Sequence, residues 1–335
     1  MKKILVFLCA LCVLCGGLPA QTKKILADAN TIKELGNPHP QAKLVPVNKE
    51  NVMQEITDAD AYIGTVTPQM VRAGKNLKWV QVMSAGVENV LHLSGGADLR
   101  DSNIVLTNNQ IVQGPEIADH AMAMLLYLTR ALNIYGAAKA KEEWPRMRFP
   151  GIELSGRNGV VIGCGGIGQQ IAMRAWAFGM NITGIDPEDI PYSPFFKRVV
   201  KPDQINEVIP QADVVFISAP HTPMSHKMVG PEQFGMMKKG AYFIAVSRGG
   251  LYDLNALVKA LDEKRLTGAG VDVTDPEPLP KGHPLWKFDN VMITPHIAGR
   301  SDKDHARMIG TIQENIKRFC DGRPLINVVD KQKGY

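Results

Sequence analysis

Three polar residues suited to moving a proton and holding an anion each follow an apolar segment in the second half of this 335-residue chain. Arg248 stands in AVSRGG, Glu277 in DPEPLP and His296 in TPHIAG. Histidine suits the transfer of a hydroxyl proton because its pKa lies near neutrality, and a neighbouring carboxylate favours the imidazolium. A guanidinium can hold both oxygens of a carboxylate or polarise a carbonyl. Together the three residues indicate acid–base chemistry on a small acid.

Each of the three residues has an ordinary alternative when it is taken singly. Arg248 could be a surface charge, Glu277 a solvated loop residue and His296 a capping residue. Their joint position favours chemistry, since each follows a predicted strand at the edge where a parallel sheet presents its ligands. We interpret His120 as a packed or hydrogen-bonded histidine. The remaining histidines, interpreted as surface or structural, are His39, His92, His221, His226, His283 and His305.

A glycine turn in the middle of the chain predicts a dinucleotide site. A buried-strand pattern runs directly into Gly163, Gly165 and Gly168, and apolar residues then recur at helical spacing. The first glycine allows the tight turn, the second lets the backbone approach a pyrophosphate, and the third lets the helix pack on the strand. The next apolar strand ends in Asp186, where an acid accepts ribose hydroxyls. A glycine turn that binds nothing is the alternative, and the flanking strand, helix and acid argue against it.

The acid that closes the second strand also bears on the choice of cofactor. Asp186 would repel a 2′-phosphate, and neither Pro187 nor Glu188 offers positive charge. NAD(H) is therefore expected rather than NADP(H).

Short apolar segments alternate with amphipathic ones, which predicts an α/β protein with parallel sheets covered on both faces. Strands are expected at 25–29, 44–47, 61–64, 79–83, 104–107, 160–162, 182–185, 198–200, 213–219, 241–247, 268–273 and 291–294. Helices are expected at 51–57, 68–73, 202–209, 231–237, 254–263 and about 302–320, the last with Ser301 and Asp304 as a box-like cap.

A long helix that opens at Gly114-Pro115-Glu116 is apolar nearly all round, so it must be buried on more than one face. Residues 130–144 continue this helix or form an arm. Because the dinucleotide unit begins after it, the N-terminal sheet is expected to be a separate domain. We predict a substrate domain over 21–106 and 302–335, and an NAD-binding domain over 107–301.

The first twenty residues differ from the rest of the chain. Lys2 and Lys3 precede an unbroken apolar run from Ile4 to Cys15, which predicts a signal peptide over 1–20 with Gln21 as the mature N-terminus. The run is short for a membrane span. Export to the periplasm or outside is expected, and an uncleaved anchor or a misassigned start with a cytoplasmic location is the alternative.

The rest of the composition excludes several classes of function. The chain has 38 Lys and Arg against 33 Asp and Glu, without a basic run or an aromatic ladder, so nucleic acid is not an expected partner. Outside the leader only Cys164 and Cys320 remain. Neither a disulfide framework nor a metal site is indicated.

The motifs, in their order, resemble those of the D-isomer-specific 2-hydroxyacid dehydrogenases from about Ile25 to Val329. They are SAGVEN at 84–89, the buried helix from Pro115, GCGGIG at 163–168, HTP at 221–223, SRGG at 247–250, GAGVDV at 268–273, EPLP at 277–280, HPLW at 283–286 and TPHIAG at 294–299. The resemblance implies two similar domains, a flavodoxin-like substrate domain and a Rossmann NAD-binding domain. The active site would lie in the cleft between them, and the last helix would cross back to the first domain.

The resemblance also implies a role for individual residues. His296 would be the acid/base, Glu277 its partner and Arg248 the residue that orients the substrate. Backbone around Ala85 and Gly86 would contact the substrate carboxylate. The cofactor contacts implied, with the glycine turn, are Gly163, Gly165, Gly166, Ile167, Gly168, Asp186, Thr222, Val246, Ser247 and Asp272. Family members commonly dimerise through the cofactor domain, so a homodimer is expected.

Two features depart from the family pattern. Ala245 stands where asparagine is frequent, and the leader is foreign to a family that is usually cytosolic. The expected activity is interconversion of a small 2-keto acid and its D-2-hydroxy acid with NAD. A non-catalytic NAD(H)-sensing or scaffold protein on the same fold is the alternative, although such a module has no need of an acid/base histidine. A formate dehydrogenase would have glutamine where Glu277 stands.

Overall fold

The computed structural model describes residues 22–93, 96–146 and 151–335. The predicted signal peptide lies outside these residues. Within the described ranges, no helix has both the length and the apolar character needed to cross a membrane.

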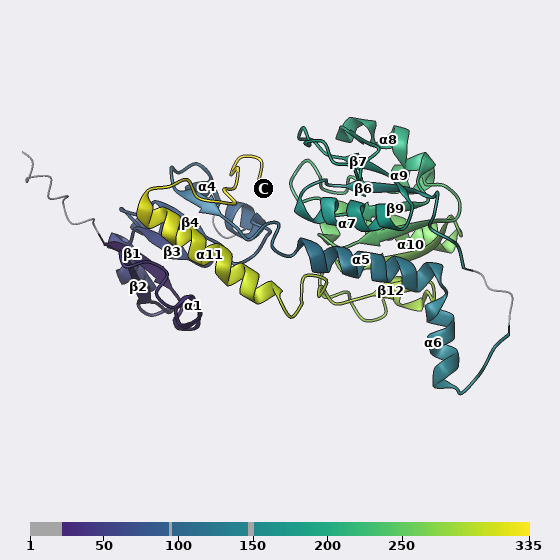
Figure 1. Cartoon of the computed structure of the whole chain (residues 1–335), viewed down its shortest axis with the longest axis horizontal. Helices are drawn as coiled ribbons and strands as arrows, with labels where there is room; N and C mark the ends of the chain where they lie inside the picture. Colours follow the sequence, from purple (N-terminus) through teal and green to yellow (C-terminus); the bar gives the residue numbers. More distant parts are fainter. Residues whose placement is uncertain (1–21, 94–95, 147–150) are drawn as a thin grey trace, which may run out of the picture.

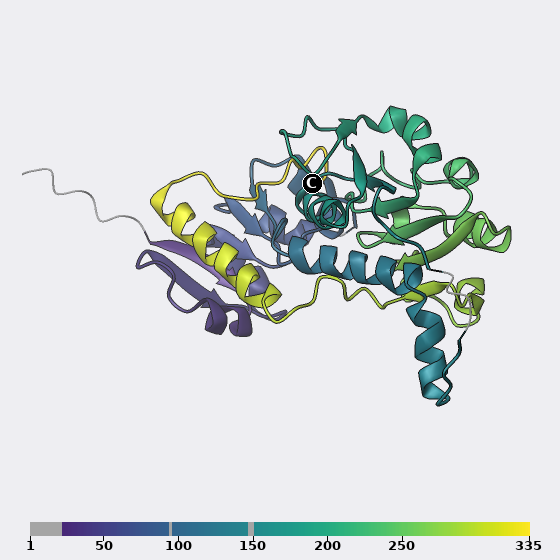
Figure 2. The ribbon, with the colours of Figure 1, turned by 45° about the vertical axis from the view of Figure 1, so that its right-hand side comes forward.

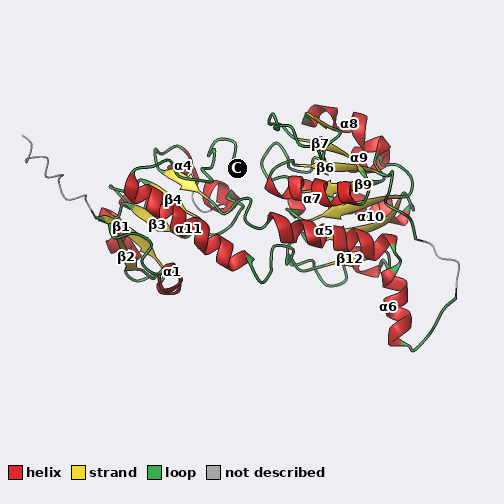
Figure 3. Cartoon of the chain, in the orientation of Figure 1, coloured by secondary structure: helices red, strands yellow, loops and turns green. Residues whose placement is uncertain are grey.

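Two parallel sheets organise the chain (Figures 1 and 3). The five-stranded sheet has the order β2-β1-β3-β4-β5, which is the flavodoxin-like order. Its strands are β1 (Lys23–Ala27), β2 (Ala42–Pro46), β3 (Ala61–Ile63), β4 (Trp79–Gln81) and β5 (Val105–Thr107). The helices between them are α1 (Ala29–Leu35), α2 (Val52–Glu55), α3 (Pro68–Ala73), a π-helical turn (Asn89–Leu93) and α4 (Gly96–Arg100).

The seven-stranded sheet has the order β12-β11-β10-β9-β6-β7-β8, which is the Rossmann order extended by one strand. Its strands are β6 (Asn158–Ile162), β7 (Asn181–Ile185), β8 (Arg198–Val200), β9 (Val214–Ile217), β10 (Ala241–Ala245), β11 (Leu266–Val271) and β12 (Val291–Ile293). Its helices are α5 (Gly114–Thr129), α7 (Gly166–Ala177), α8 (Ile205–Val208), α9 (Pro231–Met236) and α10 (Leu254–Asp262). The predicted α/β class with two doubly wound sheets is therefore confirmed.

Helices cover both faces of the second sheet because alternate strand residues point to opposite sides. In β9, Val215 and Ile217 join a core with α9 and α10, whereas Val214 and Phe216 join a core with α5 and α7. α5 contacts α7, β10 and β11, which explains why this helix is apolar nearly all round.

The chain passes between the two sheets twice. It leaves the first sheet before α5, and it returns after β12 as α11 (Asp304–Asp321), whose Ile309, Ile312 and Ile316 pack with Trp79 (Figures 1 and 2). Arg307 of α11 donates to Glu116 of α5 at 2.6 Å, so an ion pair joins the two connecting helices. The domain boundaries expected at 106/107 and 301/302 remain predictions.

Some elements differ from the sequence expectations, and the structure decides between the two alternatives left open for residues 130–144. β1 ends at Ala27 instead of residue 29 because the Asp28 side chain accepts from Asn30 N and Thr31 N, both at 3.0 Å, and so begins the unpredicted α1. α6 (Leu132–Ala140) forms the arm rather than a continuation of α5, because Ala131 adopts φ +54° between the two helices (Figure 1). α11 begins at Asp304, whose N–H donates to Ser301 Oγ at 3.0 Å.

Candidate active site

The three predicted catalytic residues follow neighbouring strands of the second sheet. Arg248 follows β10, Glu277 follows β11, and His296 follows β12. These strands are adjacent and parallel, so their carboxyl ends lie along one edge. The fold thus brings residues from distant parts of the sequence to the same edge.

Glu277 and His296 form a direct pair. Glu277 Oε2 lies 2.8 Å from His296 Nδ1, and Glu277 Oε1 accepts from Thr274 N at 3.0 Å. The carboxylate is therefore held at both oxygens and fixes the imidazole through Nδ1. The His296 side chain is 45% exposed, so its other ring nitrogen, Nε2, is the one available to a substrate.

The loop that carries His296 is held by a buried acid. Asp272 is 3% exposed, and its carboxylate accepts from Thr294 Oγ1 at 2.5 Å, Ile297 N at 2.9 Å and Ala298 N at 3.0 Å. The Asp272 carbonyl also accepts from His296 N at 2.8 Å. These bonds hold His296 at φ +53°, a left-handed conformation that costs free energy unless its surroundings impose it. The structure therefore gives Asp272 a positioning role, and its expected cofactor contact remains a prediction.

His120 of α5 contributes to the same loop. Its Nε2 lies 3.0 Å from Thr294 Oγ1, which confirms the interpretation of His120 as a hydrogen-bonded histidine.

Arg248 is bonded to the first domain rather than to the Glu277–His296 pair. Its Nε donates to Glu88 Oε1 at 2.6 Å, and its Nη1 donates to the Ser247 carbonyl at 2.8 Å. Glu88 lies in the SAGVEN loop that follows β4. Burial by itself would raise the pKa of Glu88, but the charge of Arg248 and the hydrogen bond from Arg248, with smaller contributions, together lower that pKa. Glu88 was missed in the sequence, where its only signal is its place in that motif.

Gly86 permits the close approach of Arg248 to the SAGVEN loop. A Cβ at this position would collide with Arg248 Nη2 and would lie 2.5 Å from Glu88 Oε2. The guanidinium therefore lies against the Gly86 backbone. The expected substrate residues Ala85, Gly86 and Arg248 belong to one cluster, since Asn108 Nδ2 also fixes the Ala85 carbonyl at 2.6 Å.

We expect Gly86→Ala to raise the KM for the substrate by about tenfold or more, because the added methyl displaces a guanidinium that forms charge-assisted hydrogen bonds. Steady-state kinetics with thermal melting measures this effect. Gly310→Ala in α11 is the control, since no heavy atom lies within 4 Å of a Cβ there. An unchanged KM in Gly86→Ala would show that the loop does not position Arg248.

The glycine turn has the geometry that a pyrophosphate requires. Gly163 adopts φ +91°, and a Cβ there would lie 2.5 Å from Ala219 N. A Cβ on Gly168 would collide with the Gly163 carbonyl, whereas a Cβ on Gly165 meets no heavy atom within 4 Å. α7 begins at Gly166, so its N-terminal N–H groups lie beside the open backbone at Gly165.

Asp186 fixes the turn in addition to closing β7. It is 8% exposed, and its carboxylate accepts from Cys164 N at 2.7 Å and from Glu188 N at 2.9 Å. Burial raises the pKa of the Cys164 thiol, and the Asp186 charge raises it further, so this cysteine is a neutral packing residue.

The remaining expected cofactor residues line the same edge. Thr222 is 8% exposed and Val246 is 3% exposed, and Ile167 follows Gly166 in the first turn of α7. Ser247 Oγ is buried, and no residue in the described ranges bonds to it. A buried hydroxyl without a partner is costly, so a bound group would satisfy it. These residues fit a dinucleotide.

His221 lies beside the site, although the sequence interpretation treated it as surface or structural. A Cβ on Gly250 would lie 2.5 Å from His221 Cε1, and His221 Nε2 lies 3.0 Å from His226 Nδ1. Burial lowers the pKa of His221, and the neighbouring His226 lowers it further. The neutral form of the His221 imidazole is therefore favoured beside the SRGG segment that contains Arg248.

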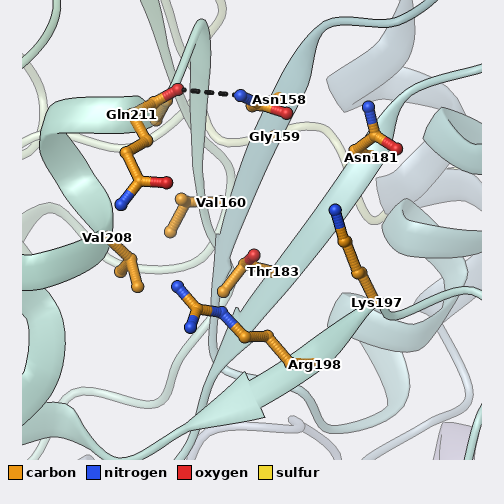
Figure 4. Close-up of a pocket in the computed structure, with 10 residues that line it drawn as sticks. Asn158, Gly159, Val160, Asn181, Thr183, Lys197, Arg198, Val208 and Gln211 are labelled. Carbon is orange, nitrogen blue, oxygen red and sulfur yellow. Dashed lines mark hydrogen bonds between the residues drawn. The ribbon is translucent and has the colours of Figure 1, made fainter.

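A separate cavity of about 350 Å³ lies at the opposite edge of the second sheet (Figure 4). It includes Asn158 and Asn181, which begin β6 and β7, together with Lys197, Arg198 and Gln211. Its lining contains none of the predicted site residues, which lie at the carboxyl edge of the sheet.

Known proteins are similar to this chain in sequence and in arrangement. Residues 122–298, just over half of the chain, match the family described as D-isomer specific 2-hydroxyacid dehydrogenase, NAD binding domain. The D-3-phosphoglycerate dehydrogenase of Methanocaldococcus jannaschii is 36% identical over 85% of this chain, and the match spans about half of that relative, 54% of its length. The glyoxylate reductase of Korarchaeum cryptofilum is 30% identical over 86% of this chain and 87% of its own.

A solved structure shows the same two-domain arrangement. A D-isomer specific 2-hydroxyacid dehydrogenase family protein from Aeromonas salmonicida superimposes with a TM-score of 0.77 and 28% identity, over 93% of this chain and 99% of its own.

Proposed function

Because this chain belongs to the D-isomer specific 2-hydroxyacid dehydrogenase family, we propose that it interconverts a small 2-keto acid and its D-2-hydroxy acid with NAD. The observation that carries the proposal is the Glu277–His296 pair at 2.8 Å, on the same sheet edge as the glycine turn and Arg248.

The residues of this chain divide the chemistry among them. The Arg248 Nη groups and the backbone at Ala85 and Gly86 hold the carboxylate of the substrate. In the reductive direction His296 Nε2 donates its proton to the substrate oxygen, and in the oxidative direction it accepts that proton. Glu277 stabilises the imidazolium and keeps the ring oriented. A bound nicotinamide supplies or accepts the hydride.

NAD(H) is the proposed cofactor because Asp186 places a buried carboxylate at the end of β7, where it would repel a 2′-phosphate. The glycine turn and the Ser247 hydroxyl, which has no partner among the described residues, support dinucleotide binding in general. Asp186 supports the preference for NAD(H) over NADP(H).

Turnover by the purified protein tests the proposal. We expect loss of NADH absorbance with at least one of glyoxylate, hydroxypyruvate, pyruvate and bulkier 2-keto acids. Because one relative is named D-3-phosphoglycerate dehydrogenase, the oxidative direction would be tested with D-3-phosphoglycerate and NAD. NADH binding without turnover on any of these acids would contradict the activity and favour a sensing or scaffold role.

We also propose a homodimer formed through the NAD-binding domain. The α6 arm projects from this domain (Figure 1). Its Leu132 and Ile134 and the nearby Trp144 are exposed. Exposed apolar groups of this kind are typical of an interface. A monomeric mass by light scattering at micromolar concentration would contradict the dimer.

A further inference from the structure

The segment 330–335 forms a compact turn that is tethered to the first domain. The Asp330 side chain accepts from Gln332 N and Lys333 N, both at 3.0 Å, and the Asp330 carbonyl accepts from Gly334 N at 2.8 Å. Lys331 Nζ donates to the Ser102 carbonyl at 2.5 Å and to the Ile104 carbonyl at 2.8 Å. The turn is therefore held by its own hydrogen bonds and by those to residues near β5.

This turn reaches across to the loop that follows β7 in the second domain. Lys333 Nζ lies 2.7 Å from Glu188 Oε1, and Tyr335 Oη donates to the same oxygen at 2.8 Å. This end of the chain, in yellow, lies between the two sheets in the view of Figure 1. Segments 145 residues apart in sequence are thereby joined.

The turn also lies beside another of the expected cofactor residues. Gly334 is buried, and a Cβ on it would lie 3.4 Å from His92 Nε2 and 3.8 Å from Thr222 Cγ2. Glu188 stands two residues after Asp186 and donates its N–H to the Asp186 carboxylate at 2.9 Å. Lys333 and Tyr335 are thus placed at the end of the site where an adenosine ribose would be recognised.

The charges on this loop are paired in a specific way. Lys201 Nζ donates to Asp189 at 2.6 Å and to the Pro187 carbonyl at 2.9 Å. The Glu188 carboxylate instead accepts hydrogen bonds from Lys333 and Tyr335. The hydrogen bond from Lys333 lowers the pKa of Glu188, and the one from Tyr335 lowers it further. Glu188 is therefore ionised at neutral pH and forms an ion pair with Lys333 of the turn.

We propose that Lys333 is a cofactor-specificity residue, which Glu188 keeps from pairing with a 2′-phosphate. The inference rests on the proposed function, because it concerns the nucleotide bound at that site. The sequence placed no positive charge after Asp186, and the structure supplies one from the other domain. With Glu188 ionised, Asp186 and Glu188 together disfavour NADP(H); without the Glu188 charge, Lys333 is free to pair with the phosphate.

The test is Glu188→Gln, with dissociation constants for NADH and NADPH measured by cofactor fluorescence in the absence of substrate. Glutamine keeps the size of the side chain and an oxygen acceptor, so the turn should stay docked. We expect affinity for NADPH relative to NADH to rise about fivefold, a size typical of exposed charges, and to fall again at high salt. Adding Lys333→Ala to this variant should abolish the gain. Gln332→Ala, in the same turn but without a contact to Glu188, is the control.

The outcomes separate the inference from the function on which it rests. An unchanged NADPH to NADH ratio in Glu188→Gln would overturn the inference, and so would a gain that survives the loss of Lys333, because Lys201 would then be the cation. Thermal melting of each variant checks that the fold is retained. Binding of neither nucleotide by the unmodified protein would overturn the proposed function, and the inference with it.

Discussion

Replacing His296 should lower kcat for the preferred keto acid by about 10²–10⁴-fold while NADH still binds. The loss follows from removing the imidazole that Glu277 orients through Nδ1 at 2.8 Å, and with it the proposed proton donor for the substrate oxygen. The glycine turn and Asp186 are untouched by the change, so cofactor affinity should persist. Steady-state kinetics and NADH fluorescence titration measure the two quantities separately.

The backbone at His296 decides which variant is informative. Its φ of +53° is unfavourable for alanine but tolerated by asparagine. His296→Asn therefore removes the acid/base group with little added strain, and His296→Ala gives the comparison. His305→Ala is the control, because that exposed histidine pairs with Glu34 in the first domain. If His296→Asn kept the turnover of the unmodified protein, His296 would not be the acid/base.

Arg248→Lys should lower kcat/KM by about 100-fold or more, since lysine lacks the planar fork that holds a carboxylate. One ammonium cannot keep the bond to Glu88 at 2.6 Å and the bond to the Ser247 carbonyl at 2.8 Å while also facing a substrate. The expected loss falls on both KM and kcat, because the same group binds and orients the substrate.

Glu88→Gln separates substrate binding by Arg248 from its contact between the domains. The amide still accepts the hydrogen bond from Nε but carries no charge, so we expect a smaller loss than in Arg248→Lys. Kinetics on both variants, with NADH titration as a check on the cofactor site, makes the comparison. A kcat/KM for Arg248→Lys within a few-fold of the unmodified protein would show that Arg248 does not bind the substrate.

The elements that position the site were predictable because their signals are local. A continuous apolar run indicates a strand buried on both faces, and the positions of Gly163, Gly165 and Gly168 indicate where a strand turns into a helix. The carboxyl ends of parallel strands share one edge, so the sequence predicts Arg248, Glu277 and His296 at the same edge. α1 was missed because the capping side chain of Asp28 was not recognised as the end of β1.

The contacts between the domains were not predictable in this way. Glu88 with Arg248, and Glu188 with Lys333, join residues 160 and 145 positions apart. Such pairs depend on how two separately folded sheets are placed, and no periodicity within either partner encodes that placement. The same reason explains why the sequence did not predict Lys333 beside the loop after Asp186.

Transfer of a labelled hydride tests the central claim most directly. The purified protein would be supplied with NADH deuterated at the transferable position of C4 and with the 2-keto acid, other than glyoxylate, that it reduces fastest, because glyoxylate gives glycolate, which has no D or L form. The product would be analysed by mass spectrometry and chiral chromatography. The account predicts a D-2-hydroxy acid with deuterium at C2. An L-2-hydroxy acid, or the absence of deuterated hydroxy acid with every keto acid tested, would contradict it.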